Sequence, residues 1–369
     1  MTFSQNEKAI YLFCAELHQT KTKALTIIEW NTLVKSLANH RLNPEYLLTC
    51  THNEIMQLLS EATPAQKERI AKKVELRKQL GLSLIELDEV IHQGYQIVFR
   101  RNMPERLKKL MLNHRPAFYY FLGDLNILNS THVLGVVGAR DAMEDELVRV
   151  REISKDAAKS GVIIVSGGAR GVDSTATDTV LEAGGNAIIF PSEGLSNWVK
   201  KKEVRKYLQN GQLLLLSTQP INARFSGYYA MQRNKFIHAT ADNTLVASSQ
   251  ISKEKKSGTW EGVLENLKYK WSKLYTIGES PGVKQLQADG QAQPFSTLRE
   301  VYFSERNLSK ILESQLEKLF KNALSAGIEK ETVKEITLNQ VKKITESQNN
   351  VKAEPYIVKE QMTIFDNRQ

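Results

Sequence analysis

The sequence predicts an α/β fold: a doubly wound, mostly parallel sheet with an N-terminal helical module and a C-terminal tail that is helical or disordered. Six short, uniformly apolar runs between residues 132 and 290 alternate with segments of helical period. This alternation is typical of parallel strands with helices on both faces. Residues 1–80 carry helical spacing alone, and the apolar pattern weakens from about residue 296. We therefore expect three regions, at residues 1–80, 81–295 and 296–369.

The first region is expected to be a small module of helices, with Pro64 and Gly81 at helix boundaries. The apolar positions that set its helical spacing are Ile55, Leu58, Leu59, Ile70, Val74 and Leu76. Residues 81–131 then contain a short strand, a basic helix and an aromatic run before Gly123. We expect this lead-in segment to pack on the sheet that follows it.

The sheet is expected within residues 132–290. The predicted strands lie at residues 132–138, 162–168, 186–192, 212–218, 244–250 and 274–278. After the first strand, Asp141 is the expected N-cap of a helix, with Glu144 three residues on and Gly161 at its end. The apolar face of this helix comprises Leu147, Val150, Ile153 and Ala157. In such sheets, ligands bind at the carboxyl ends of the strands.

The composition indicates a basic, ordinary globular protein. The 369 residues carry a formal net charge of +9 and have a pI near 9.2, which favours a polyanionic partner such as nucleic acid. The two cysteines, Cys14 and Cys50, can form neither a disulfide framework nor a four-cysteine zinc site, so we expect a cytoplasmic protein. No apolar run approaches the ~20 residues that span a bilayer, and the N-terminus lacks the pattern of a signal peptide.

A glycine-rich stretch, "SGGARG" at residues 166–171, follows the second predicted strand. Glycines at a strand-to-helix turn let the backbone approach a ligand, and the helix that follows presents N–H groups to an anion. The spacing matches neither the dinucleotide pattern G-x-G-x-x-G nor the P-loop. A phosphate site is one interpretation, and a tight turn that needs small residues is the other.

Three further clusters favour an extended anionic groove along the same edge of the sheet. One follows the first strand, the second is an Arg-Asn-Lys run expected just before a buried helix, and the third is "KEKKSGT". The third cluster begins with the lysines Lys253, Lys255 and Lys256. Together with the glycine stretch, the candidate groove residues are Gly138, Arg140, Ser166, Gly167, Gly168, Arg170, Arg233, Asn234, Lys235, Ser257, Gly258 and Thr259.

The ordered motifs "VGAR", "SGGARGVD", "QRNKFIHATAD" and "SGT" resemble those of the DNA-processing protein A family (DprA, also called Smf), over roughly residues 81–295. The resemblance implies a Rossmann-like domain that binds single-stranded DNA, protects it and helps to load a RecA-type recombinase. It also implies a homodimer without catalysis or cofactor, acting in natural transformation. The candidate groove residues would then be DNA-binding residues.

The chain departs from the family pattern at three positions. Thr177 stands where the family usually has histidine, Thr218 where it has an acidic residue, and Lys235 where arginine is more common. A winged-helix C-terminus, present in many members, is not evident. The pathway is therefore open between transformation and a defence or mobile-element role.

Such a groove would hold phosphates with arginines and backbone N–H groups, without reading sequence. Single-stranded bases also need stacking surfaces. The aromatic candidates, each of which could equally be a core residue, are Trp198, Phe225, Tyr228, Tyr229 and Trp260. The cations that could extend the path, or simply form a solvated helix face, are Lys200, Lys201, Lys202, Arg205 and Lys206.

Two alternative functions use the same sheet edge. "SGTWEG" resembles the end of the G-G-x-G-T-x-x-E motif of lysine-decarboxylase-like phosphoribohydrolases, with Glu261 one position early. In that class Glu261 would assist cleavage of a glycosidic bond, and a nucleotide sensor without turnover would use the same pocket. The seven histidines are scattered without metal-ligand spacing, so we predict no metal and no catalytic residue.

The C-terminal "EQMTIFDNRQ" is an isolated apolar stretch on a polar tail. Gln361, Met362, Ile364 and Phe365 resemble the short peptide with which bacterial DNA-metabolism proteins bind the replicative sliding clamp. A terminal strand that packs on the protein's own core is the alternative.

Overall fold

A computed structural model describes residues 3–17, 22–80, 82–251 and 257–303 of the chain. The chain divides into two compact units, Met1–Leu298 and Arg299–Gln369. The predicted tail helix and the predicted clamp peptide lie outside the described residues. Within the described parts, no helix combines the length and apolar character needed to cross a membrane.

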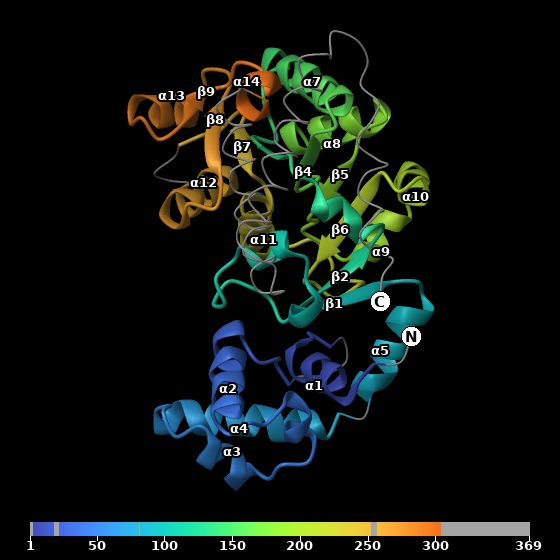
Figure 1. Cartoon of the computed structure of the whole chain (residues 1–369), viewed down its shortest axis with the longest axis vertical. Coiled ribbons are helices and arrows are strands. Elements are labelled where there is room, and N and C mark those ends of the chain that lie inside the picture. Colours follow the sequence, from blue (N-terminus) through green and yellow to red (C-terminus); the bar gives the residue numbers. More distant parts are fainter. Residues whose placement is uncertain (1–2, 18–21, 81, 252–256, 304–369) are drawn as a thin grey trace, which may run out of the picture. The chain divides into compact units, whose positions relative to one another are not determined.

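The region predicted at residues 1–80 is helical where the structure describes it (Figure 1). Its elements are α1 Gln5–Cys14, α2 Ile27–Asn39, η1 Pro44–Leu48, α3 His52–Leu58 and α4 Pro64–Lys78. A further helix, α5 Leu82–His92, begins the lead-in segment, where no helix is predicted before the first strand. Capping boxes define the start of four of these helices, since a Ser or Thr side chain accepts from the third helical N–H and a Glu or Gln side chain accepts in return. The N-caps are Ser4, Thr26, Thr51 and Thr63.

The apolar positions of the helical spacing lie in helices, but one of them is not buried. Leu76 is 40% exposed, whereas its neighbour Arg77 is fully buried. The Arg77 guanidinium donates to the backbone carbonyls of Leu12, Ala15 and Thr22, so hydrogen bonds satisfy it inside the module. The other apolar positions of the spacing, Ile55, Leu58, Leu59, Ile70 and Val74, are buried.

A mostly parallel sheet follows, in the strand order β1-β2-β6-β5-β4-β3-β7-β8-β9. The strands are β1 Gln96–Phe99, β2 Phe118–Leu122, β3 Val133–Val137, β4 Ile163–Ser166, β5 Ala187–Ile189, β6 Leu213–Ser217, β7 Asn243–Val246, β8 Lys273–Thr276 and β9 Gln293–Pro294. Strands β3 to β8 are the six predicted strands. The lead-in segment adds β1 and β2, which pair antiparallel with each other and, through β2, with β6.

Helices cover both faces of the sheet, which confirms the doubly wound α/β class (Figure 1). Helices α7 Glu144–Lys159 and α8 Val172–Glu182 pack together on one face, and α11 Gly227–Thr240 and α12 Gly258–Tyr269 pack together on the other. The change of face follows from the topology, because the chain returns from β6 to the far side of β3 through α11. The remaining helices are η2 Arg100–Asn102, α6 Glu105–Lys108, η3 Leu125–Asn129, α9 Leu195–Val199, α10 Lys202–Gln209, α13 Pro281–Ala288 and α14 Leu298–Tyr302.

The central strands are largely apolar because both of their faces are buried, and their polar residues are Ser166, Ser217, Asn243 and Thr244. Every residue of β3, β4, β5, β6 and β7 is buried. On the α11 face, Val137, Val165 and Ile188 join Phe236 of α11 and Val263 of α12 in one apolar cluster. This core fixes the strand ends, and therefore the loops that leave them.

Helix α7 starts two residues later than expected. Its N-cap is Met143, whose N–H donates to the Glu146 carboxylate at 3.0 Å, so the expected Asp141–Glu144 cap is wrong. A carboxylate at the third helical position caps the helix even though the N-cap side chain is apolar. Gly161 ends this segment with a φ of +67°, as predicted. Along the expected apolar face, Val150, Ile153 and Ala157 are buried and Leu147 is half-buried.

Candidate nucleic-acid interface

Three loops meet at the carboxyl ends of β3, β4 and β5. Strands β3 and β4 pair in parallel, as do β4 and β5, so the segments after them lie side by side. The N–H of Val172 donates to the carbonyl of Ala139 at 3.3 Å, which ties the second loop to the first. We call this edge the crest and define it by Gly138–Arg140, Gly167–Gly171 and Ser192–Glu193.

Two glycines of the crest combine a left-handed backbone with a close contact. Gly168 has a φ of +64°, and a Cβ on it would lie 2.2 Å from Cη2 of Trp198. Gly171 has a φ of +88°, and its Cβ would lie 2.5 Å from the carbonyl oxygen of Ala139. Both positions therefore exclude larger residues. The tight-turn interpretation of "SGGARG" accounts for these two glycines.

A buried ion pair lies directly beneath the glycine loop. The Arg233 guanidinium is 3.3 Å from the Asp173 carboxylate, and both side chains are buried. Burial raises the pKa of Asp173, while the Arg233 charge and hydrogen bonds from the backbone N–H groups of Ala169 and Gly167 oppose that shift. Arg233 and these loop N–H groups therefore favour the charged form of an internal carboxylate.

The crest contains a pocket of about 240 Å³. Arg140 and Arg170 line it together with the glycine loop, Trp198 and Phe225. Both arginines are exposed, and neither forms an ion pair with a described carboxylate. Arg140 lies over the ring of Phe225 at 5.3 Å, and Phe225 is itself 54% exposed. The pocket thus presents two unneutralised cations beside an accessible aromatic ring.

The Arg-Asn-Lys run does not lie at a strand-to-helix junction, so that prediction is wrong. All three residues lie inside α11, where helical neighbours and core packing surround them. Arg233 forms the buried ion pair, and the buried Lys235 ammonium donates to Gln232 at 3.2 Å. Burial lowers the pKa of Lys235. Neither cation lines the crest pocket.

The remaining candidates brace the loops. The Asn234 amide donates to the carbonyl of Gly258 at 2.8 Å, and the Thr259 hydroxyl donates to that of Gly138 at 3.0 Å. Ser257 is the N-cap of α12. The buried Ser166 hydroxyl donates to the carbonyl of Val136 at 2.6 Å, which links β4 to β3. Lys253, Lys255 and Lys256 lie outside the described residues.

The aromatic candidates separate into two groups. Phe225 and Tyr228 are exposed, the latter by 66%. Trp198 is buried under the glycine loop, Tyr229 donates its hydroxyl to Glu16 at 2.8 Å, and Trp260 packs against the core. The side chains Lys200, Lys201, Lys202, Arg205 and Lys206 are exposed on and beside α10, and the Lys201 ammonium lies 4.2 Å from the Trp198 ring centroid.

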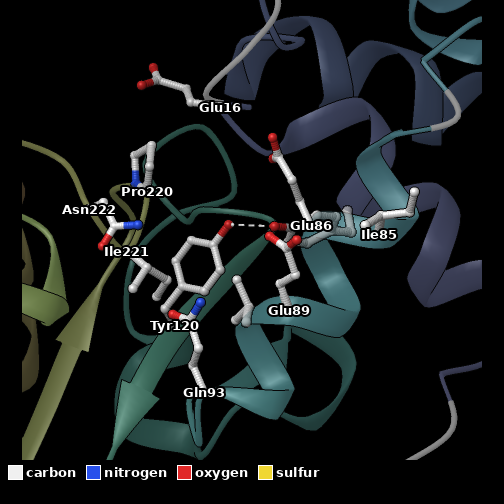
Figure 2. Close-up of a pocket in the computed structure, with 11 residues that line it drawn as sticks. Glu16, Ile85, Glu86, Glu89, Gln93, Tyr120, Pro220, Ile221 and Asn222 are labelled. Atoms are coloured by element: carbon white, nitrogen blue, oxygen red, sulfur yellow. Dashed lines mark hydrogen bonds between the residues drawn. The ribbon is translucent and has the colours of Figure 1, made fainter.

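A second, larger pocket of about 450 Å³ has the opposite charge. Figure 2 shows Glu16, Glu86 and Glu89 around it, between α5, β2 and the loop after β6. The buried Tyr120 hydroxyl donates to that of Tyr11 at 3.2 Å, and burial raises the pKa of Tyr11 to about 12. Carboxylates repel phosphate, so this pocket is unfavourable for an anionic ligand.

Sequence reasoning missed two carboxylates, one in the crest and one beneath it. Asp173 stands at the second position of α8, where an acidic residue is expected to interact with the helix N-terminus. Glu193 lies in the loop that leaves β5, four residues after Ile189, and this place beyond a strand end is the signal that could have found it. Glu193, and not Glu261, lines the arginine pocket, so the hydrolase alternative has no support from the geometry. Among the described residues, no group of three or more His, Cys, Asp or Glu could hold a metal ion.

The sheet order and the crest define a Rossmann-like protein with cationic loops at the carboxyl ends of its parallel strands. Residues 95–303 match the family model described as DNA recombination-mediator protein A. This match covers more than half of the 369-residue chain. The chain belongs to this family, which confirms the resemblance of its motifs.

The chain is similar to Protein Smf of Borreliella burgdorferi, at 28% identity over 184 residues, and to DNA processing protein DprA of Bacillus subtilis, at 24% over 153 residues. The match to Protein Smf covers 48% of this chain and 57% of the relative, and the match to DprA covers 39% of this chain and 48% of the relative. The chain therefore spans about half the length of each relative. The X-ray structure of DprA from Streptococcus pneumoniae matches with a TM-score of 0.62 at 18% identity. That match covers 82% of this chain and 98% of the pneumococcal chain, which shows a shared fold.

Proposed function

We propose that the protein binds single-stranded DNA at the crest and acts in DNA processing without catalysis of its own. One observation carries this proposal: Arg140 and Arg170 line one pocket at the carboxyl ends of parallel strands, and no described carboxylate neutralises either of them. Two free guanidinium groups at this place match the phosphates of a nucleic-acid backbone. Membership of the recombination-mediator family supports the same conclusion.

The mechanism assigns phosphate capture to the arginine side chains. The N–H groups of Gly167 and Ala169 favour the charged form of the internal Asp173, whereas Arg140 and Arg170 are exposed. Phe225 and Tyr228 offer exposed rings on which unpaired bases can stack. A duplex keeps its bases stacked internally and cannot use these rings. The site therefore favours single strands.

The wider role is an extension of the same proposal. The bound strand is protected from other proteins and passed to a RecA-type recombinase in the cytoplasm, and two copies of the chain form a homodimer. Family membership supports these roles. The pathway is either natural transformation or a defence or mobile-element process.

The C-terminal peptide adds a second partner to the proposal. Gln361, Met362, Ile364 and Phe365 would bind the replicative sliding clamp, and the polar residues before them would act as a tether. A calorimetric titration of the clamp with residues 355–369 should show binding that Phe365→Ala abolishes. Equal results for the two peptides in this titration would contradict the proposal that the C-terminal peptide binds the clamp.

The DNA-binding proposal is tested by fluorescence anisotropy with a single-stranded oligonucleotide and a duplex of the same length. We expect tighter binding of the single strand and an affinity that falls steeply as salt rises, because phosphate contacts release counterions. Equal or tighter binding of the duplex would show that base stacking has no part in recognition.

A further inference from the structure

The crest pocket contains one carboxylate among its cations. Glu193 is half-buried and lines the pocket together with Arg140 and Arg170. Within the described residues, Glu193 has no hydrogen bond or ion pair. In a site for phosphate alone, this negative charge would weaken binding. Its presence therefore indicates a ligand that offers hydrogen-bond donors as well as negative charge.

The rest of the pocket fits a flat, polar ring. The exposed Phe225 provides a stacking surface, and the Arg140 guanidinium lies 5.3 Å from its centroid. The glycine loop lies on the buried Trp198, where a side chain at Gly168 would collide. An aromatic wall, two guanidinium groups and one carboxylate thus line the same space of about 240 Å³.

Of the four DNA bases, guanine complements this set of groups. Its N1–H and N2–H₂ donors are adjacent, so both carboxylate oxygens can accept from it, while its O6 and N7 accept from an arginine. Adenine and cytosine each set an acceptor nitrogen beside the amino group on their pairing edge, and thymine sets its N3–H between two carbonyls. Each of these three would point a lone pair at a carboxylate oxygen.

We infer that the crest pocket binds an unpaired guanine base, with Glu193 accepting from its N1 and N2 groups and Arg140 or Arg170 donating to O6 and N7. The inference rests on the proposed function for the source of the base, since a base in a duplex has its pairing edge occupied. It gives the protein a base preference within an otherwise sequence-tolerant mode of binding. A free guanine nucleotide has the same chemistry.

Three single-stranded 15-mers test the inference by anisotropy: thymidine alone, thymidine with three isolated guanines, and the same strand with deoxyinosine at those positions. Deoxyinosine lacks only the 2-amino group. We expect about tenfold tighter binding of the guanine strand than of the thymidine strand. Deoxyinosine should lose most of this gain. Glu193→Gln should lose the preference while still binding the thymidine strand, whereas Glu203→Gln, an exposed glutamate on α10 outside the pocket, should retain it.

The outcomes separate the inference from the proposed function. Equal affinity for the three strands, or a guanine preference that survives Glu193→Gln, would overturn the guanine assignment and leave single-strand binding intact. Calorimetry with dGMP, dIMP and dTMP provides the second arm. In one outcome the parent binds dGMP but neither dIMP nor dTMP, Glu193→Gln does not bind dGMP, and no strand is bound. This outcome would support the guanine pocket and contradict the DNA proposal. Absence of binding in both arms would overturn both.

Discussion

Gly168 combines a left-handed backbone with a close contact, and a single methyl group tests both features. Its φ is +64°, and a Cβ would meet Trp198 at 2.2 Å. We expect Gly168→Ala to lower the free energy of unfolding by about 3 kcal/mol, because backbone strain and overpacking add. Urea unfolding with tryptophan fluorescence would measure this loss.

Gly161 provides the matched control. Its φ of +67° is nearly the same, but nothing lies within 4 Å of its Cβ position. Gly161→Ala should therefore cost only the backbone strain, about 1 kcal/mol. Similar losses for the two variants would show that the contact between the glycine loop and Trp198 contributes nothing.

At the scale of the element, α4 tests how a buried charge supports the helical module. The Arg77 guanidinium is the donor for carbonyls of Leu12, Ala15 and Thr22. We expect Arg77→Leu to lower the free energy of unfolding by about 3 kcal/mol or more, because buried carbonyls lose their partners. Leu76→Ala, at the exposed neighbouring position, should cost less than about 1 kcal/mol. Thermal unfolding followed by circular dichroism compares the two, and a larger effect at Leu76 would contradict the structure.

The sequence predicts the central strands well because each is a continuous apolar run buried on both faces. It fails where a polar group is satisfied inside the fold. Helical periodicity identifies the helix that contains Leu76 and Arg77, but it does not show that Arg77 is the buried one, because the carbonyl of Leu12 that accepts from Arg77 is far away in the sequence. For the same reason Arg233 resembled a surface cation, because its partner Asp173 is 60 residues away along the chain.

The candidate site also has parts that the sequence predicts and parts that it does not. The positions of Gly138, Arg140 and the glycine loop follow from strand order, because neighbouring parallel strands bring their carboxyl ends together. The presence of Glu193 in the site could be recognised only once the pocket was known. A glutamate after a strand has no distinguishing sequence pattern, and only the folded structure shows that Glu193 lines the same pocket as Arg140 and Arg170.

The stability of the whole molecule should depend on pH through His238. Burial, together with the Arg233 charge, lowers the pKa of His238 to about 3. Between pH ~6.5 and pH 3 the unfolded chain therefore binds a proton that the folded chain does not. The free energy of unfolding should fall as pH falls through this window, by up to about 1.4 kcal/mol per unit.

Urea unfolding at pH 7 and pH 5.5 measures this dependence. His238→Gln should reduce it, and His40→Gln, at an exposed position, should leave it unchanged. An identical pH dependence in the parent and in His238→Gln would mean that His238 titrates normally in the folded protein.

The central claim is that the arginines of the crest hold the DNA backbone. The most direct test is an anisotropy titration of one single-stranded oligonucleotide with the parent, Arg170→Ala and Arg149→Ala over a range of salt concentrations. Arg149 is exposed on α7 and does not line the pocket, so its removal changes net charge equally. We predict that Arg170→Ala weakens binding and lowers the salt slope by about 1, while Arg149→Ala behaves like the parent. Parental affinity and salt slope in a folded Arg170→Ala protein would contradict the account.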